Sequence, residues 1–237
     1  MDALIEIKTL LQRASRPTSG ESPIFYKTGP GDYAEHDQFI GVSVPYLRKI
    51  AKMHGALTLP SIQTLIESPI NEERLLALYI LVFQYQQESY SGKDRIYRFY
   101  LNNFKYINNW NLVDASAHWI IGCHLLNADK TMLLTLAQSS VMWERRISIV
   151  STWYFIKHNE FDWTIKLATI LRNDTHDLIH KAVGWMLREV GKRDRLALIH
   201  FLDQYAHQLP RTMLRYAIEK FSVDERKSYL LKKTLNP

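Results

Sequence analysis

The 237-residue chain contains a single cysteine, Cys123. One cysteine excludes an internal disulfide framework and a zinc site built from several cysteines. Cys123 stands in a mostly apolar run from Ile120 to Leu126, which indicates a small buried hydrophobe rather than a nucleophile. Chains without disulfides are typical of reducing compartments, so the cytoplasm is the expected location.

The sequence also lacks the run of about 18 apolar residues that a membrane span requires, so no contact with a membrane is expected. The first residues, Met1 to Glu6, carry acids where a secretory signal carries bases. No alternating pattern is strong enough to predict a sheet. Hydrophobic residues make up 46% of the chain, which is enough for a substantial core and argues against global disorder.

Acidic residues are in the minority, and the imbalance lies in one part of the chain. Residues 1–139 hold 13 Lys/Arg and 13 Asp/Glu, whereas residues 140–237 hold 17 Lys/Arg and 11 Asp/Glu and account for the whole net charge of +6. A basic half beside a neutral half is typical of a face that binds a polyanion, although ordinary soluble proteins also show it.

Apolar residues recur at spacings of three and four between short turn segments, which predicts an all-α chain. The predicted helices cover residues 4–11, 44–53, 75–83, 107–126, 147–156, 165–171, 178–190, 196–205 and 213–221. A weak internal repeat aligns Arg74, Asp114, Arg146, Lys181 and Arg215. The intervals between these positions, roughly 30–40 residues, are in the range of two-helix solenoid repeats of the HEAT or armadillo kind.

The expected architecture is therefore a single HEAT-like solenoid domain over residues 1–237. An N-terminal cap region would occupy residues 1–55, and stacked helix pairs would follow over residues 56–237. Because the inner helices of such an array share one face, they are expected to line a concave, basic groove suited to a polyanion.

The N-terminal region departs from the repeat, since residues 25–33 are rich in glycine and aromatic residues. Neither a dinucleotide fingerprint nor a P-loop is indicated, because no strand precedes Gly29 and Gly31 and no phosphate-binding Lys-Ser pair follows. The next helix is predicted to begin after Ser43 as N-cap, with Pro45 in the first turn.

The stretch from Asn109 to Asp114 sets an indole and a carboxylate one helical turn apart, because Trp110 and Asp114 are at positions i and i+4. An indole face and a carboxylate both attract positive charge, so the pair suits a substrate that is or becomes cationic. The alternative is that Trp110 belongs to the core and Asp114 to an ordinary helix surface.

Four stretches together resemble the AlkD-like DNA alkylation-repair glycosylases, a HEAT-like family that removes alkylated purines. The resemblance extends roughly from Phe25 to Phe221. Its carriers are Tyr33 with residues 39–49, then residues 109–114, 143–150 and 181–189. The motifs occur in order and at solenoid spacing, which makes the resemblance fairly specific.

The resemblance implies roles for four residues. Trp110 and Asp114 would flank the reacting sugar, Arg146 would contact a backbone phosphate, and Trp185 would form a second aromatic wall. We expect these four side chains to share one concave surface. Further expected DNA contacts are Tyr33, Arg145, Lys181 and Arg215.

We therefore expect a DNA glycosylase that hydrolyses the N-glycosidic bond of cationic N3- or N7-alkylated purines. It would need no cofactor and would act as a monomer on double-stranded DNA, in the cytoplasm and at the nucleoid. The rival is a non-catalytic helical-repeat scaffold that binds DNA or protein through the same groove. Asp114 discriminates between the glycosylase and the scaffold. An acid that faces DNA lowers the affinity for DNA, so a protein that only binds DNA would gain from losing it.

A metal site is a distant alternative. His176 and His180 are at i and i+4, but an aspartate replaces the glutamate of the zinc-protease signature and no third ligand is evident. The prediction is therefore a polar helix start without a bound metal.

Overall fold

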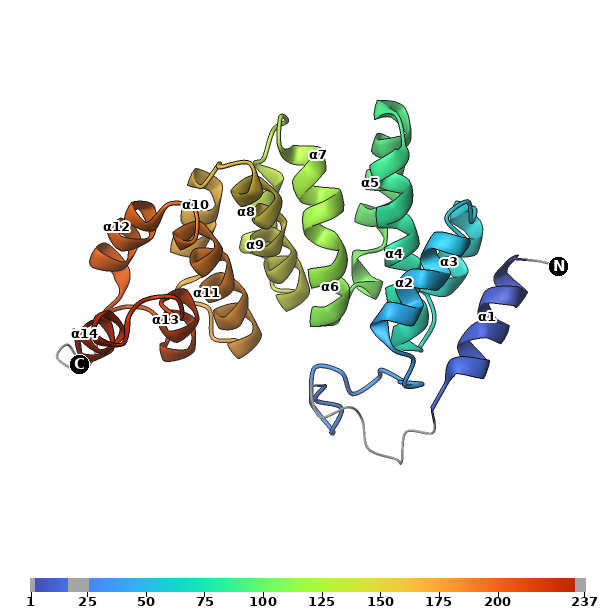
Figure 1. The fold of residues 1–237 in the computed structure, drawn as a ribbon, viewed down its shortest axis with the longest axis horizontal. Helices are drawn as coiled ribbons and strands as arrows, with labels where there is room; N and C mark the ends of the chain where they lie inside the picture. The colour runs from blue at the N-terminus through green and yellow to red at the C-terminus, as the bar shows by residue number, and fades with distance from the viewer. Residues whose placement is uncertain (1–2, 17–25, 233–237) are drawn as a thin grey trace. The chain divides into compact units, whose positions relative to one another are not determined.

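The computed structural model describes residues 3–16 and 26–232, and most of them are helical (Figure 1). The α-helices are α1 (Ala3–Ala14), α2 (Val44–Met53), α3 (Leu59–Ile66), α4 (Asn71–Gln87), α5 (Tyr90–Asn102), α6 (Trp110–Ala117), α7 (Cys123–Leu125), α8 (Met132–Ala137), α9 (Met142–Lys157), α10 (Asp162–Leu171), α11 (Asp177–Gly191), α12 (Arg195–Tyr205), α13 (Arg211–Ala217) and α14 (Val223–Lys232). A 3-10 turn spans Phe104–Tyr106 and a π-helical segment spans His118–Gly122.

The all-α prediction is confirmed. Within residues 3–16 and 26–232 the only β feature is an isolated parallel bridge between Gln38 and Ile70. None of the helices in these ranges is long and apolar enough to cross a membrane.

The chain forms two compact units, Met1–Ser116 and Ala117–Pro237, and each is described by itself. In the first unit α4 is the central helix, with α2, α3 and α5 packed against it. Every side chain from Asn71 to Leu78 is buried, which is typical of a helix enclosed on all sides. Because this stretch includes Glu72, Glu73 and Arg74, the core of the first unit contains charged groups that need partners.

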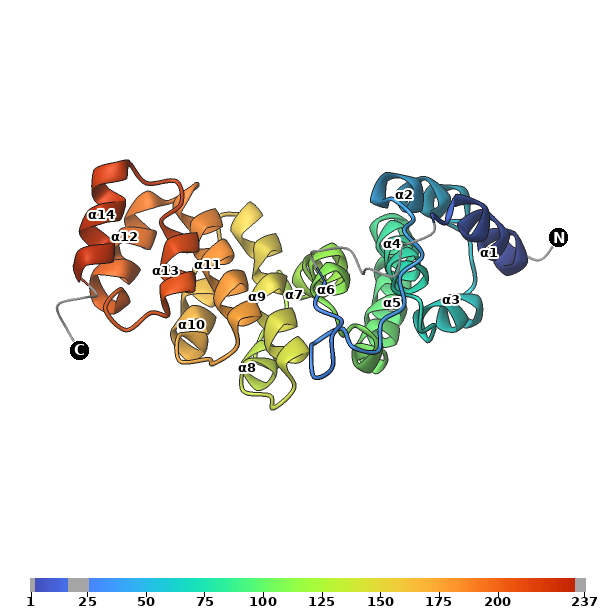
Figure 2. The same cartoon turned by 90° about the horizontal axis from the view of Figure 1, so that it is seen from below.

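In the second unit α9, α11 and α13 pack one against the next, and Figures 1 and 2 both show them side by side. α8, α10 and α12 pair with these helices, so the unit is built from successive helix pairs. This stacking is the helical-repeat arrangement that the sequence predicts, because no single pair can bury its own apolar face.

Two glycines occupy equivalent positions in this stack. A Cβ at Gly122 would collide with the carbonyl oxygen of Ser151 and the side chain of Tyr154. A Cβ at Gly184 would collide in the same way with Met213 and Tyr216, which follow it at the same offsets along the chain. Only glycine permits such close approach of two helix backbones, so these contacts show the repeat in three dimensions.

Several predicted boundaries differ from the structure. The helix expected over residues 107–126 begins at Trp110 and contains the π-helical segment. The helix expected to end at Phe221 ends at Ala217. α2 begins after Ser43 as predicted, although the Ser43 side chain makes no capping hydrogen bond. Phe25, the first residue of the expected resemblance, lies outside the described residues.

Candidate functional site

Trp110 and Asp114 lie one turn apart on α6, and both are half-buried. Their neighbours Leu112 and Val113 are fully buried, so the apolar side of α6 is formed by other residues. Both Trp110 and Asp114 therefore keep part of their surface accessible to solvent in the first unit. An indole and a carboxylate on one accessible helix face can together contact a cationic group.

The ring of Trp110 is stacked on a residue that the sequence did not single out. Tyr26 lies 5.2 Å from Trp110 between ring centroids, with an interplanar angle of 16°. Tyr26 also stacks on Phe39, with 4.4 Å between ring centroids. The sequence contains one signal for this contact: Tyr26 lies in the aromatic, glycine-rich stretch of residues 25–33. In that stretch Tyr33, not Tyr26, was the predicted DNA contact.

The lead-in segment, residues 26–43 before α2, is joined to α4 by the buried carboxylate of Asp37. Asp37 forms an ion pair with Arg74, and the exposed fractions of the two side chains are 5% and 7%. The carboxylate also accepts hydrogen bonds from the side-chain amides of Asn71 at 2.9 Å and Asn109 at 2.7 Å. Since Asn109 precedes Trp110, this network fixes the start of α6 relative to α4.

A second carboxylate holds the end of the same segment. The backbone N–H groups of Ile40 and Gly41 donate to Glu72, at 3.1 and 2.8 Å. Burial raises the pKa of Glu72, and these amide donors oppose the rise. Burial, reinforced by the charge of Glu72, also raises the pKa of Tyr26, so its phenol is neutral at physiological pH.

Arg146 lies in the interior of the second unit, with an exposed fraction of 5%. One guanidinium nitrogen donates to the carbonyl of Leu178 at 2.5 Å, which joins α9 to the start of α11. Arg145, the next candidate for a phosphate contact, forms an ion pair with Asp174 at 2.6 Å. Both arginines therefore have protein partners in addition to any role toward DNA.

Lys181 and Arg215 are more accessible. Lys181 on α11 forms an ion pair with Asp177 at 2.8 Å, and 41% of its side chain is exposed. Arg215 on α13 is exposed and lines a hollow together with Arg226 and Lys227 of α14. Of the predicted DNA contacts in the second unit, Arg215 presents the most accessible charge.

Trp185 is half-buried on α11, next to Gly184. Gly184 faces α13, so the close approach that it permits is that of a neighbouring helix. Trp185 packs edge-to-face on Trp153 of α9, with 4.9 Å between ring centroids and an interplanar angle of 62°. Its orientation is thus set by side chains of the second unit.

The two histidines of the possible metal face have structural partners. The ring of His176 accepts from the Leu178 amide at 3.2 Å and caps α11. Nε2 of His180 lies 2.5 Å from the Asp174 carbonyl oxygen. Within residues 3–16 and 26–232, no group of three His, Cys, Asp or Glu side chains is arranged to hold a metal ion.

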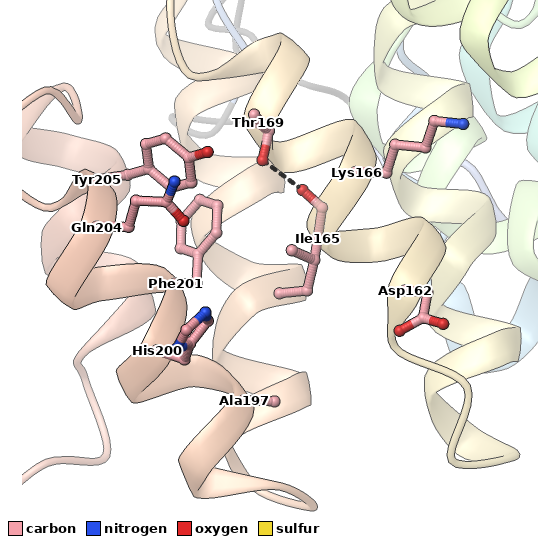
Figure 3. A pocket seen from close by; sticks show the side chains of 9 residues that line it. All are labelled: Asp162, Ile165, Lys166, Thr169, Ala197, His200, Phe201, Gln204 and Tyr205. Atoms are coloured by element: carbon pink, nitrogen blue, oxygen red, sulfur yellow. Dashed lines mark hydrogen bonds between the residues drawn. The ribbon is translucent and has the colours of Figure 1, made fainter.

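A hollow on α10 and α12 is separate from these residues (Figure 3). It is lined by Asp162, Ile165, Lys166, Thr169, Ala197, His200, Phe201, Gln204 and Tyr205. None of the predicted site residues lines this hollow. Trp110, Asp114 and Tyr33 belong to the first unit, whereas Arg145, Arg146, Lys181, Trp185 and Arg215 belong to the second.

Comparisons with known proteins agree on one family. A family model described as DNA alkylation repair enzyme matches residues 7–221. A solved structure described as a predicted DNA alkylation repair enzyme from Enterococcus faecalis has the same fold, with a TM-score of 0.64 and 16% sequence identity over 81% of this chain and 92% of that chain. No functionally curated protein matches the sequence. Because the family model covers most of the chain, the protein belongs to the family of DNA alkylation repair enzymes.

Proposed function

We propose that the protein is a DNA glycosylase that hydrolyses the N-glycosidic bond of cationic N3- or N7-alkylated purines. The family gives it a role in alkylation repair and implies DNA as its partner. The observation that carries the finer proposal is the accessible pair of Trp110 and Asp114 on one face of α6.

The chemistry of the substrate explains why so few groups suffice. Alkylation at N3 or N7 places positive charge on the purine, which then leaves without a general acid. The glycosidic bond breaks toward an oxocarbenium-like sugar, and the enzyme must stabilise that cation and present water at C1′. A fixed carboxylate does both, by electrostatic attraction and by orienting the water.

Asp114 is the proposed carboxylate, and Trp110 and Trp185 are the proposed aromatic walls beside the deoxyribose. Each indole would contribute about 0.5–2 kcal/mol through cation–π attraction, depending on desolvation. Since Tyr26 is stacked on one face of Trp110, the sugar would meet the opposite face or displace the phenol.

The basic charge of residues 140–237 supports a DNA-binding groove on the repeat helices. Lys181, Arg215, Arg145 and Tyr33 would contact the DNA. Arg146 would contact a phosphate from its buried position. Its hydrogen bond to the Leu178 carbonyl also holds the start of α11. The protein would act as a monomer on double-stranded DNA of the nucleoid.

The test is base release from methylated double-stranded DNA, followed by chromatography of the free bases. The wild-type protein is expected to release 7-methylguanine or 3-methyladenine. Asp114→Asn and Trp185→Ala are both expected to lower this release, because both side chains would flank one sugar. Tight binding without any release by the wild type would favour the non-catalytic scaffold.

Arg215→Gln is expected to weaken DNA binding and to reduce the slope of log K against log salt concentration by about 0.9, because one neutralised phosphate contributes about that much. The measurement is a salt titration by fluorescence anisotropy. Lys166→Gln on α10 is the matched control, since it also removes one exposed charge. An unchanged slope for Arg215→Gln would place this arginine outside the DNA contact.

A further inference from the structure

Lys157, the last residue of α9, stands beside two indoles of the second unit. Its ammonium lies 4.1 Å from the ring centroid of Trp153 and 4.6 Å from that of Trp119. Trp153 is one turn earlier on α9, whereas Trp119 belongs to the π-helical segment. The imidazole of His118 contacts both indoles, at centroid distances of 4.5 and 4.9 Å.

Two consecutive residues of the π-helical segment, His118 and Trp119, belong to this cluster. Here His118 and Trp119 both contact residues of α9. Such wide turns are frequent at functional sites, where they change the direction of a side chain.

Lys157 is half-buried, and its surroundings disfavour the charged form of its side chain. Burial, followed by repulsion from Arg193, lowers the pKa of Lys157, and the carboxylate of Glu189 opposes the shift. Glu189 already has Arg188 and Lys192 as ion-pair partners, so its charge is shared. The indole faces supply the remaining attraction, because a ring quadrupole stabilises a cation that has lost hydration.

The cluster reaches the proposed site residue Trp185 through the ring of Trp153. Trp153, whose ring lies under Lys157, packs edge-to-face on Trp185 at 4.9 Å. Edge-to-face packing restricts the ring plane as well as the position. The backbone that carries Trp185 is held independently, because Gly184 lies directly against α13.

We propose that Lys157 is a positioning residue: its ammonium, which lies over both Trp119 and Trp153, restrains the ring of Trp153, and Trp153 in turn fixes the ring plane of Trp185. The proposal rests on the role of Trp185 beside the sugar. Lys157 touches neither substrate nor the reacting atoms in this mechanism. Its effect is therefore on the rate of the chemical step, which is sensitive to the placement of stabilising groups, rather than on DNA affinity.

The experiment compares Lys157→Met, which keeps the length of the side chain, with Lys157→Arg, which keeps the cation over the rings. Single-turnover excision and DNA affinity are measured for both. The protein is also labelled with 5-fluorotryptophan, and the fluorine resonance of Trp185 is assigned through Trp185→Phe. Lys166→Met is the matched control, because Lys166 lies 4.7 Å from the ring of Trp163, away from the cluster.

Lys157→Met is expected to slow excision by about 3- to 10-fold, the effect of losing the cation–π contact with Trp153, while the DNA dissociation constant changes by less than about 2-fold. The Trp185 resonance is expected to shift or broaden. Lys157→Arg is expected to keep the excision rate and the Trp185 resonance of the wild type. Lys166→Met is expected to change neither quantity. Combined with Trp153→Phe, the effect of Lys157→Met is expected to be less than additive, because both act through one ring.

An unchanged Trp185 resonance in Lys157→Met would overturn the positioning role, and so would a shifted resonance with an unchanged excision rate. A loss of DNA affinity equal to the loss of rate would make Lys157 a phosphate contact instead. If the wild type excised no base, the glycosylase proposal would fail, and the fluorine resonance would still decide whether Lys157 orients Trp185.

Discussion

Asp114→Asn is expected to lower the rate of alkylpurine excision by about 100- to 1000-fold, which is the usual cost of losing a preorganised electrostatic group. The amide keeps the size of the side chain but cannot stabilise an oxocarbenium-like sugar. DNA affinity is expected to stay the same or increase, because one negative charge near the phosphates is removed. Single-turnover excision and anisotropy binding measure the two effects separately.

Asp162→Asn is the control for Asp114→Asn, since it removes an exposed acid on α10 and is expected to leave excision unchanged. Excision at the wild-type rate by Asp114→Asn would eliminate the proposed mechanism. A variant with weaker DNA binding and unchanged chemistry would instead make Asp114 part of the DNA contact surface.

Asp37→Ala is expected to lower the free energy of unfolding by about 3–5 kcal/mol, because it leaves the buried guanidinium of Arg74 without its carboxylate. The same change removes the acceptor of Asn71 and Asn109, so the start of α6 loses its tie to α4. Urea denaturation followed by circular dichroism measures the loss.

The double variant Asp37→Ala with Arg74→Met tests the cause of that loss. A buried ion pair replaced by apolar side chains often costs little, so the double variant is expected to recover part of the stability. The two amides would still lack their acceptor, which sets the unrecovered part. A loss below about 1 kcal/mol for Asp37→Ala would mean that the pair behaves like an exposed salt bridge.

The local part of the candidate site was predictable from the sequence. Helical spacing alone places Trp110 and Asp114 on one face, and the structure leaves both half-buried on α6. The all-α class follows from the same periodicity, because apolar residues at three- and four-residue spacing can be buried only by a helix face. Trp185 was likewise found through its motif, and it is also half-buried.

The orientation of Arg146 was not predictable in the same way. The middle of α9 is enclosed, since all residues from Arg146 to Thr152 are buried. A helix that is buried on all sides carries no periodic signal to distinguish an inner from an outer face. The repeat alignment could therefore give the register of Arg146 but could not show that its guanidinium reaches the Leu178 carbonyl.

Contacts between distant segments were also beyond sequence reasoning. Tyr26 and Trp110 are far apart in the sequence, and their rings stack on each other. Tyr26 belongs to the lead-in segment, whose sequence has no helical periodicity. The network of Asp37, Arg74 and Asn109 joins three separate stretches of the first unit. Such pairings depend on the path of a loop, whereas propensity and spacing describe only neighbours along the chain.

The two glycine contacts make some helix–helix interfaces of the second unit more rigid than others. Where Gly122 meets α9 and Gly184 meets α13, backbone touches backbone, and sliding of one helix along the other is blocked within a fraction of an ångström. Between α9 and α11 the contact of Trp153 with Trp185 joins two side chains rather than two backbones. A small rotation of one helix pair relative to the next is therefore expected to be easier between α9 and α11 than at the two glycine contacts.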